Sequence, residues 1–201
     1  MIASQVSLNR NAIQQLKLSD PYAIHKFVYN LFPGVKRNFL YYDQGGNWQY
    51  RKILILSEEQ PTLPPFGKIE SKYIPPTFLH HKTYAFQVLL NPVDHPAGKK
   101  NKSPVIGKGA LYDWFLKRQA YWGFSANPIS LEIFNEGVQI IEGKGRVVTH
   151  NRAEFRGILQ VTNYDLFHHS FVKGIGRAKA FGFGLLQLRP IKEKETTDDY
   201  K

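Results

Sequence analysis

A glycine-rich, cationic segment near the C-terminus constrains this chain more than any other stretch. It reads Gly174-Ile175-Gly176-Arg177-Ala178-Lys179-Ala180-Phe181-Gly182-Phe183-Gly184-Leu185-Leu186, with four glycines in eleven residues. Glycine tolerates backbone conformations that other residues avoid, and its bare backbone lets a polyanion approach the amides closely. Arg177 and Lys179 add positive charge to that contact. The segment therefore predicts a loop that binds phosphate groups.

The overall charge also favours a polyanionic partner. The 201 residues hold 27 Lys plus Arg against 16 Asp plus Glu, a formal net charge of +11. Such an excess is typical of proteins that bind nucleic acid or an anionic membrane surface. A membrane is disfavoured, because no apolar run approaches the roughly 20 residues that cross a bilayer and the N-terminus lacks a signal-like apolar core. The absence of cysteine excludes disulfides and cysteine-ligated zinc. We expect a soluble, cytoplasmic protein.

Residues 1–92 predict a first α+β domain. Asp20 followed by Pro21 is typical of a helix start, and apolar residues then recur with helical spacing until Pro33-Gly34. Strands are predicted before and after this helix, over residues 2–8, 38–43, 48–56 and 83–90, with a hairpin turn at 44–47. A strand, a helix, two strands and a returning strand make up most of a ferredoxin-like domain.

Residues 93–108 have the composition of a basic linker or loop, and residues 109–190 predict a second domain. Its expected elements are a helix over 110–122, strands over 129–133 and 138–141, a β-hairpin formed by 145–150 and 154–161, a helix from the Asn163 cap to Val172, and a strand over 185–188. Residues 191–201 are expected to be a flexible polar tail. Helices and strands thus follow a comparable order twice, which predicts two tandem ferredoxin-like, RRM-like domains.

Known phosphate-binding motifs narrow the role of the glycine-rich segment. No Gly-x4-Gly-Lys-Ser/Thr loop is present, and the glycines follow a predicted helix rather than open one, which is the reverse of a dinucleotide fingerprint. Lys179-Ala180-Phe181-Gly182-Phe183 partly fits the aromatic motif of RNA-binding sheets, except at Ala180. A tight helix-to-strand turn would also explain the glycines. The interleaved cations and aromatic residues favour nucleic acid, and Arg146, Arg152 and Arg156 extend the basic surface along the predicted hairpin.

The histidines are the candidates for chemistry. Adjacent pairs such as His80-His81 and His168-His169 point in different directions and do not form a natural metal clamp, so we expect no catalytic metal and no cofactor. His25 lies beside the apolar stripe of the first helix, three residues after Tyr22. At that spacing both side chains can meet one substrate group. An ordinary exposed helix histidine is the simpler interpretation, and the sequence leaves both open.

The chain resembles the CasE-type CRISPR endoribonucleases, the subunits that process pre-crRNA in the subtype I-E Cascade complex. The resemblance rests on the pattern Gly174-Ile175-Gly176-x-Ala178-Lys179-x-x-Gly182-x-Gly184-Leu185-Leu186, on Tyr22-x-x-His25 with Leu31-Phe32-Pro33, and on Phe155-x-Gly157 with Leu159. It implies tandem ferredoxin-like domains, metal-independent cleavage at the base of a repeat stem-loop, His25 as general acid/base, and Tyr22 as its assistant. The implied partners are CRISPR repeat RNA and other Cascade subunits.

The expected reaction uses the 2′-hydroxyl of the RNA as nucleophile and leaves a 5′-hydroxyl and a 2′,3′-cyclic phosphate, which can open to a 3′-phosphate. Imidazole suits the proton transfers because its ordinary pKa lies near 6.5. The residues expected to bind RNA or offset its charge are Lys26, Arg146, Arg152, Arg156, Lys173, Gly174, Gly176, Arg177, Lys179, Gly182 and Gly184. Two alternatives remain: a non-catalytic RNA-binding module, and a structural subunit that only holds crRNA.

Overall fold

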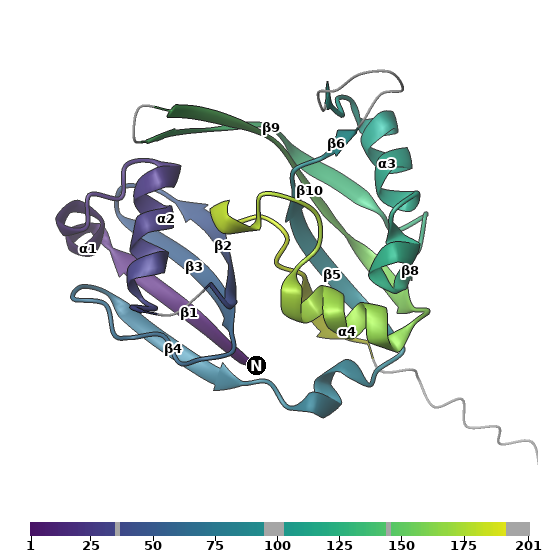
Figure 1. Cartoon of the computed structure of the whole chain (residues 1–201), viewed down its shortest axis with the longest axis horizontal. Helices are drawn as coiled ribbons and strands as arrows, with labels where there is room; N and C mark the ends of the chain where they lie inside the picture. Colours follow the sequence, from purple (N-terminus) through teal and green to yellow (C-terminus); the bar gives the residue numbers. More distant parts are fainter. Residues whose placement is uncertain (35–36, 95–102, 144–145, 192–201) are drawn as a thin grey trace, which may run out of the picture.

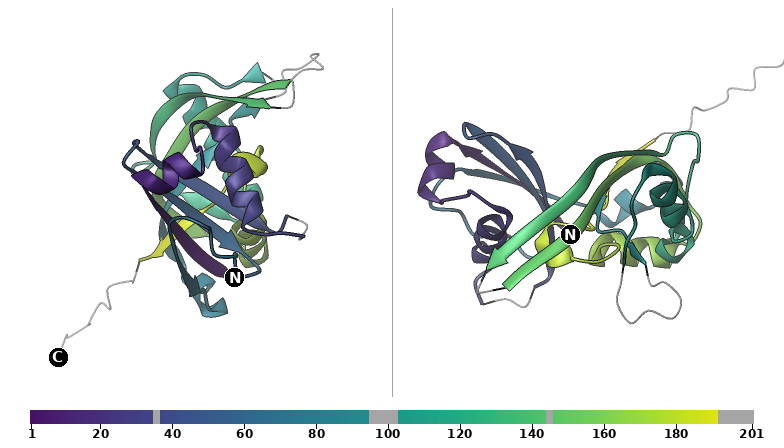
Figure 2. Two further views of the ribbon diagram at one scale, coloured as in Figure 1. Left: turned by 90° about the vertical axis from the view of Figure 1, so that its left-hand side faces the viewer. Right: turned by 90° about the horizontal axis from the view of Figure 1, so that it is seen from above.

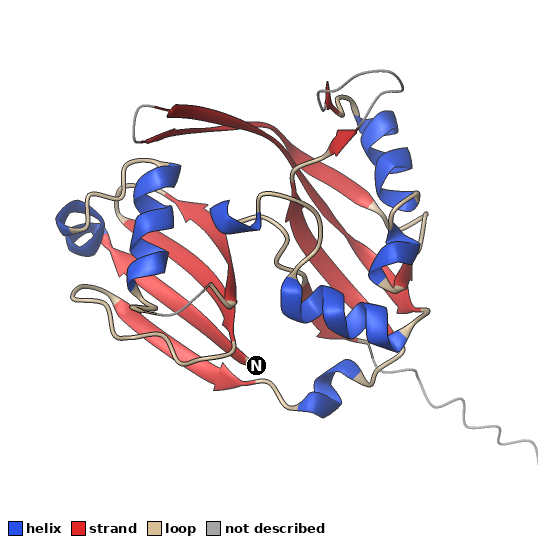
Figure 3. Ribbon diagram, viewed as in Figure 1, coloured by secondary structure: helices blue, strands red, loops and turns tan. Residues whose placement is uncertain are grey.

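The computed structural model describes residues 1–34, 37–94, 103–143 and 146–191, which form two antiparallel sheets with their helices (Figure 1). Figure 3 shows these sheets in red and the helices in blue. Residues 95–102, half of the linker predicted over 93–108, and residues 192–201 of the predicted tail fall outside the described residues. No helix in the described ranges is long and apolar enough to cross a membrane.

The first sheet has the strand order β2-β3-β1-β4. Its strands are β1 (Ile2–Asn9), β2 (Phe39–Gly46), β3 (Tyr50–Ser57) and β4 (Lys68–Tyr73). Helices α1 (Arg10–Gln15) and α2 (Pro21–Asn30) pack on it through one apolar cluster that includes Ile24, Phe27 and Val28. Helix α2 begins as predicted, because the Asp20 carboxylate accepts a 2.9 Å hydrogen bond from the Ala23 amide and Pro21 occupies the first turn.

The second sheet has the order β11-β5-β10-β8, and β9 pairs with the same edge of β10 as β8. Its strands are β5 (Thr83–Leu90), β8 (Phe124–Ala126), β9 (Glu132–Gly143), β10 (Arg146–Val161) and β11 (Gln187–Pro190). Its helices are α3 (Lys108–Leu116) and α4 (Tyr164–Lys173), with short 3₁₀ turns η1 (Pro76–Leu79), η2 (Gln119–Trp122) and η3 (Lys179–Phe181). β6 (Val93–Asp94) and β7 (Ser103–Pro104) form a separate two-stranded ladder. The expected fold of two ferredoxin-like units is confirmed.

The strand over 83–90 belongs to the second sheet, so its assignment to the first domain was wrong. It pairs along its length with residues 153–160 of β10 and buries Tyr84, Phe86 and Val88. β4 completes the first sheet instead. Five of its six residues are exposed, so β4 lacks the apolar alternation by which a strand is recognised in a sequence.

The predicted hairpin between 145–150 and 154–161 was also wrong. These residues form one 16-residue strand, β10, which pairs with a continuous β9 where two short strands were expected. The register of the pairing between β10 and β9 shifts between Arg152 and Glu154, at the position where the hairpin turn was expected. β9 ends at Gly143 and β10 begins at Arg146, and these two residues are paired with each other. Beyond the sheet, β9 and β10 form an arm that reaches across to α2 (Figures 1 and 2).

The glycine-rich segment lies between the two sheets and joins their cores. Ile175, Phe183 and Leu185 are buried in one cluster with Leu40 of β2 and Leu56 of β3. The Ile175 amide donates to the Gly184 carbonyl at 3.0 Å, and the Gly184 amide donates to the Leu89 carbonyl at 2.8 Å. The segment is therefore a closed loop anchored to β5, whose tip, η3, points toward α2 (Figure 1).

Candidate active site

His25 on α2 is held by the tip of the glycine-rich loop. Its Nδ1 lies 2.8 Å from the Ala180 carbonyl oxygen. A carbonyl oxygen only accepts hydrogen bonds, so Nδ1 carries the proton and the neutral imidazole keeps its lone pair on Nε2. Nε2 forms no hydrogen bond with any described residue. The contact joins two segments 155 residues apart in the sequence and turns His25 into an oriented proton acceptor.

Three aromatic rings surround the His25 imidazole. Tyr22 stacks at 5.9 Å between ring centroids with an interplanar angle of 14°, as the spacing on the helix had suggested. Tyr29 lies at 4.2 Å and Phe181 at 4.9 Å. Rings on several sides restrict the rotation of the imidazole, so its orientation does not depend on the Ala180 hydrogen bond alone. Tyr29 was recognisable beforehand, because it stands four residues after His25 on the same helix.

The charge of Arg37 acts on two groups, His25 and Lys179, from different parts of the chain. Partial burial lowers the pKa of His25, the hydrogen bond to Ala180 opposes that effect, and the charge of Arg37 lowers the pKa further. Burial also lowers the pKa of Lys179, again with a contribution from Arg37. Arg37 therefore lies close enough to influence both groups. It was missed in the sequence because it follows the first helix without any recognisable motif.

Several loop glycines are required by their backbone conformation and by the close packing around them. Gly174, Gly182 and Gly184 have φ of 73°, 89° and 82°, a region that favours glycine. A Cβ atom at Gly182 would lie 3.0 Å from the Tyr41 ring, and one at Gly174 would lie 2.8 Å from a Leu40 methyl group. The tight-turn explanation therefore accounts for these glycines. Their contact with RNA stays a prediction.

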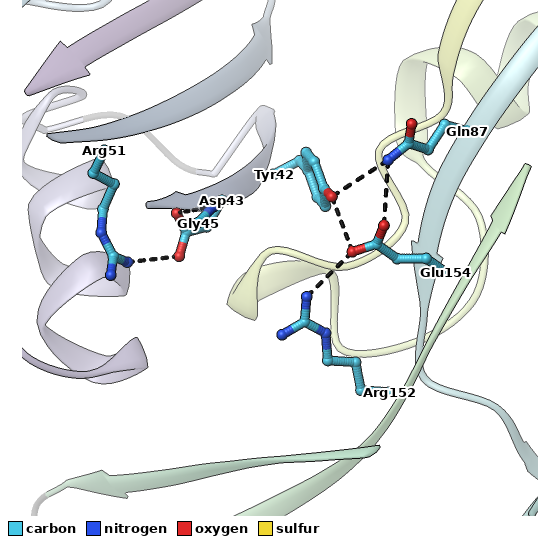
Figure 4. Close-up of polar contacts among 7 residues, drawn as sticks. All are labelled: Tyr42, Asp43, Gly45, Arg51, Gln87, Arg152 and Glu154. Carbon is cyan, nitrogen blue, oxygen red and sulfur yellow. Dashed lines mark hydrogen bonds and ion pairs between the residues drawn. The ribbon is translucent and has the colours of Figure 1, made fainter. Parts of the chain in front are cut away.

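A polar network beside the site ties β2 of the first sheet to β5 and β10 of the second. Glu154 is 1% exposed and accepts hydrogen bonds from the Tyr42 hydroxyl at 2.9 Å, Gln87 Nε2 at 3.3 Å and Arg152 Nη2 at 3.2 Å (Figure 4). Burial, followed by the Glu154 charge, raises the pKa of Tyr42 well above its ordinary value, so its hydroxyl remains a donor. The network fixes Arg152 at the wall of a cavity of about 210 Å³ that Phe181 also lines.

Other predicted residues lie apart from His25 or are already paired. Lys173 Nζ is 2.9 Å from Glu58 Oε1, and Arg156 contacts Glu132 through both Nε and Nη2, at 2.8 and 2.6 Å. Lys26 lies over the Tyr22 ring, with Nζ 4.8 Å from its centroid, next to the site. Arg177 is exposed at the far side of the loop from His25. Arg146 begins β10, but its side chain lies outside the described part of the structure.

His150 is a further residue that sequence reasoning missed. Its ring lies 5.3 Å from Phe181 and 5.7 Å from Phe183 between centroids, so Phe181 contacts two histidines. Burial lowers the pKa of His150. Nothing in the local sequence of β10 marks this residue, because its neighbours come from the loop thirty positions later. Within the described ranges, no group of three or more His, Asp or Glu side chains is placed to hold a metal ion.

The profile of a family described as CRISPR associated protein matches residues 1–190. Similar solved structures include the CRISPR endoribonuclease Cse3 bound to a 19-nucleotide RNA, with a TM-score of 0.82 and 17% identity, covering 94% of this chain and 100% of that one. Cas6e from Escherichia coli str. K-12 gives a TM-score of 0.75 and 22% identity, covering 95% and 100%. Thermus thermophilus Cse3, bound to an RNA representing a pre-cleavage complex, gives 0.77 and 17%, covering 94% and 98%. No curated protein matches the sequence.

Proposed function

Because this chain belongs to the family of CRISPR-associated proteins, we propose that it is an endoribonuclease that cleaves the stem-loops of CRISPR repeat RNA to give mature crRNA. The observation that carries the proposal is the hydrogen bond between His25 Nδ1 and the Ala180 carbonyl, which leaves Nε2 as a proton acceptor on a basic protein. The similar folds of Cse3 and Cas6e, one of them bound to an RNA representing a pre-cleavage complex, support the same conclusion.

The chain's own groups are sufficient for the proton transfers. His25 Nε2 removes the proton of the 2′-hydroxyl, whose oxygen attacks the adjacent phosphorus while the bond to the 5′-oxygen breaks. The protonated His25 then returns that proton to the leaving 5′-oxygen, and the products are a 2′,3′-cyclic phosphate and a 5′-hydroxyl. A neutral imidazole at pH 7 is what this first step needs, and the lowered pKa of His25 maintains that form.

Nearby cations offset the charge that develops on the phosphorane. Arg37 and Lys179 act on the His25 side of the loop, and Lys26 stands one residue along the helix from His25. Positive groups already held in place stabilise such charge without having to reorganise during the reaction. Tyr22, stacked beside His25, orients the imidazole or the substrate. We assign the binding of flanking phosphates to Arg152, Arg177 and the remaining predicted cations.

We also propose that the protein acts as a subunit of a larger complex. A solved CRISPR RNA-guided surveillance complex contains a chain that matches this fold with a TM-score of 0.73 and 16% identity, covering 95% of this chain and 100% of that one. We therefore place this protein in the cytoplasm as a subunit of a complex of that kind, retaining the crRNA that it has cut.

The first test is cleavage of a stem-loop RNA with the repeat sequence of the protein's own CRISPR array in the presence of EDTA. We expect one cut that persists in EDTA and yields a 2′,3′-cyclic phosphate, identified by mass spectrometry. A single 2′-deoxy substitution at the scissile nucleotide removes the nucleophile, so cleavage of that RNA is expected to cease while its binding persists. A cut that requires Mg²⁺, or that survives the 2′-deoxy substitution, would contradict the mechanism.

A second prediction concerns the cations of the loop. Replacing Arg177 and Lys179 with alanine is expected to weaken stem-loop binding and to reduce the slope of log affinity against log salt by about 1 to 2, because each phosphate contact releases roughly one counterion. Fluorescence anisotropy across a salt titration measures both quantities. The matched control is the double substitution of Lys68 and Lys72, two exposed lysines on β4. Equal slopes for the two double variants would refute the role of the loop in RNA binding.

A further inference from the structure

A second pocket lies on the side of the glycine-rich loop that faces α3 and η2. Its volume is about 480 Å³, within the range of sites that hold small organic molecules. Gly176 and Arg177 of the loop form one wall, and Tyr121 and Trp122 of η2 form another. The glycine-rich loop and an aromatic surface therefore meet at one cavity, which the mechanism at His25 does not use.

Asn91 connects this pocket to His150. The residue lines the cavity and is 93% buried, since its relative exposure is 7%. Its Nδ2 donates to His150 Nδ1 at 3.2 Å, whereas its Oδ1 is buried and has no partner among the described residues. Asn91 therefore belongs to the buried wall between the pocket and His150.

Tyr121 and Arg177 supply the groups that a nucleotide requires. Tyr121 is 77% exposed and offers a ring face at the rim of the pocket, and aromatic rings of this kind stack on bases of single-stranded RNA. Arg177 is exposed and makes no ion pair with any residue that the structure describes. Arg118, by contrast, is committed to Asp94 at 3.0 Å and to the Trp114 ring, 4.5 Å from its centroid. Arg177 is thus the cation available for a phosphate.

The pocket is connected to the proposed cleavage site by consecutive contacts. Asn91 bonds to His150, the His150 ring packs on Phe181, and Phe181 packs on His25. Along the chain, Arg177 precedes Lys179 of η3 by two residues. An RNA strand that follows the loop from one side to the other therefore passes both sites.

We propose that this pocket binds one unpaired nucleotide of the RNA, with its base against Tyr121 and its phosphate against Arg177. This inference rests on the proposed function for the identity of the RNA, but its chemistry does not require cleavage. The site would let the enzyme recognise a single-stranded flank of the stem-loop in addition to the stem itself.

The test uses short RNA without a stem, so that it is independent of cleavage. The probes are a fluorescent hexaadenylate and an abasic hexamer of equal charge. Anisotropy with the full chain is expected to show about tenfold tighter binding of hexaadenylate than of the abasic hexamer, because stacking is lost without the base.

Tyr121→Ala is expected to abolish the preference for hexaadenylate, and Tyr121→Phe to keep it, because the ring and not the hydroxyl carries the stacking. Tyr73→Ala removes another exposed tyrosine, on β4, and is expected to change nothing. Adenosine monophosphate is expected to displace the hexamer only at concentrations far above that of the hexamer. Displacement at equal concentrations would instead identify a free nucleotide as the occupant and overturn the proposal.

The proposal is also overturned if Tyr121→Ala keeps the preference, or if Tyr73→Ala loses as much of it. These outcomes are separate from the fate of the proposed function. Cleavage of the stem-loop that depends on its 2′-hydroxyl, together with a Tyr121→Ala variant that behaves like the unaltered protein, would reject this pocket alone. A base preference that depends on Tyr121 in a protein that cuts no stem-loop would reject the endoribonuclease and leave the pocket standing.

Discussion

A His25→Asn variant is expected to bind the repeat stem-loop normally and to cleave it about 10²–10⁴ times more slowly than the unaltered protein. Asparagine carries an amide nitrogen close to the position of Nδ1, so it can still donate to the Ala180 carbonyl, which accepts at 2.8 Å from His25. It has no atom in place of Nε2 and cannot take the proton of the 2′-hydroxyl. Single-turnover kinetics with excess protein in EDTA measures the loss of rate, and anisotropy measures the affinity.

The matched control is His168→Asn, which changes an exposed histidine on α4 and is expected to leave the rate unchanged. Comparing His25→Asn with His25→Ala separates the effect of losing the acid/base group from the effect of losing the hydrogen bond to the Ala180 carbonyl. Both variants lack the acid/base group, but only the alanine variant also lacks the hydrogen bond to the loop. A His25→Asn protein that retains most of its cleavage rate would exclude His25 as the proton acceptor, whatever the alanine variant does.

The pH dependence of the unaltered protein follows from the same group. The active form is the neutral imidazole, so the rate rises with pH through the pKa of His25 and then levels off. Burial, helped by the charge of Arg37, holds that pKa below the ordinary value of about 6.5. We therefore expect a plateau that already includes pH 7 and an acidic limb whose midpoint lies below about 6.5. Arg37→Ala removes the unfavourable charge and is expected to move the midpoint upward.

Local signals predicted those elements whose burial pattern repeats along the chain. α2 combined an Asp20 cap, a proline in its first turn and a regular apolar stripe, and each of these acts within a few residues. The cap of α4 at Asn163 was equally local. β4 was not predicted, because an exposed edge strand owes its place to its neighbour β1 and not to its own composition.

In the candidate site, too, only the residues with a local sequence signal could be predicted. Tyr22 and His25 could be paired from their helical spacing alone. The carbonyl of Ala180, by contrast, carries no side-chain signature, and its partner His25 lies 155 residues earlier. The glycine-rich segment was correctly recognised as a special backbone, but its sequence could not distinguish a loop that contacts phosphates from one that orients a histidine. In the structure the η3 tip orients His25 through the Ala180 carbonyl. Contact with the phosphates of RNA is the role that we propose in addition.

Gly184→Ala is expected to lower the free energy of unfolding by about 2–4 kcal/mol, and the melting temperature by roughly 5–15 °C for a chain of this size. Gly184 has φ of 82°, which alanine adopts only with strain, and its added methyl group would overlap the Ile175 carbonyl oxygen. The overlap is with backbone, so no rotamer change relieves it. It would also disturb the hydrogen bonds that Gly184 makes to Ile175 at 3.0 Å and to Leu89 at 2.8 Å. Differential scanning calorimetry measures the loss.

Gly176→Ala provides the comparison, because this glycine has a similar φ of 73° in the same loop. Its added methyl group would meet only a Leu90 methyl group at 3.2 Å, and that side chain can move aside. We expect a loss of about 1 kcal/mol, from backbone strain alone. Equal losses for the two variants would show that φ strain, and not the closure of the loop on Ile175, sets the requirement for glycine. A larger loss at Gly184, accompanied by slower cleavage in the folded fraction, would show that loop closure also positions the Ala180 carbonyl that holds His25.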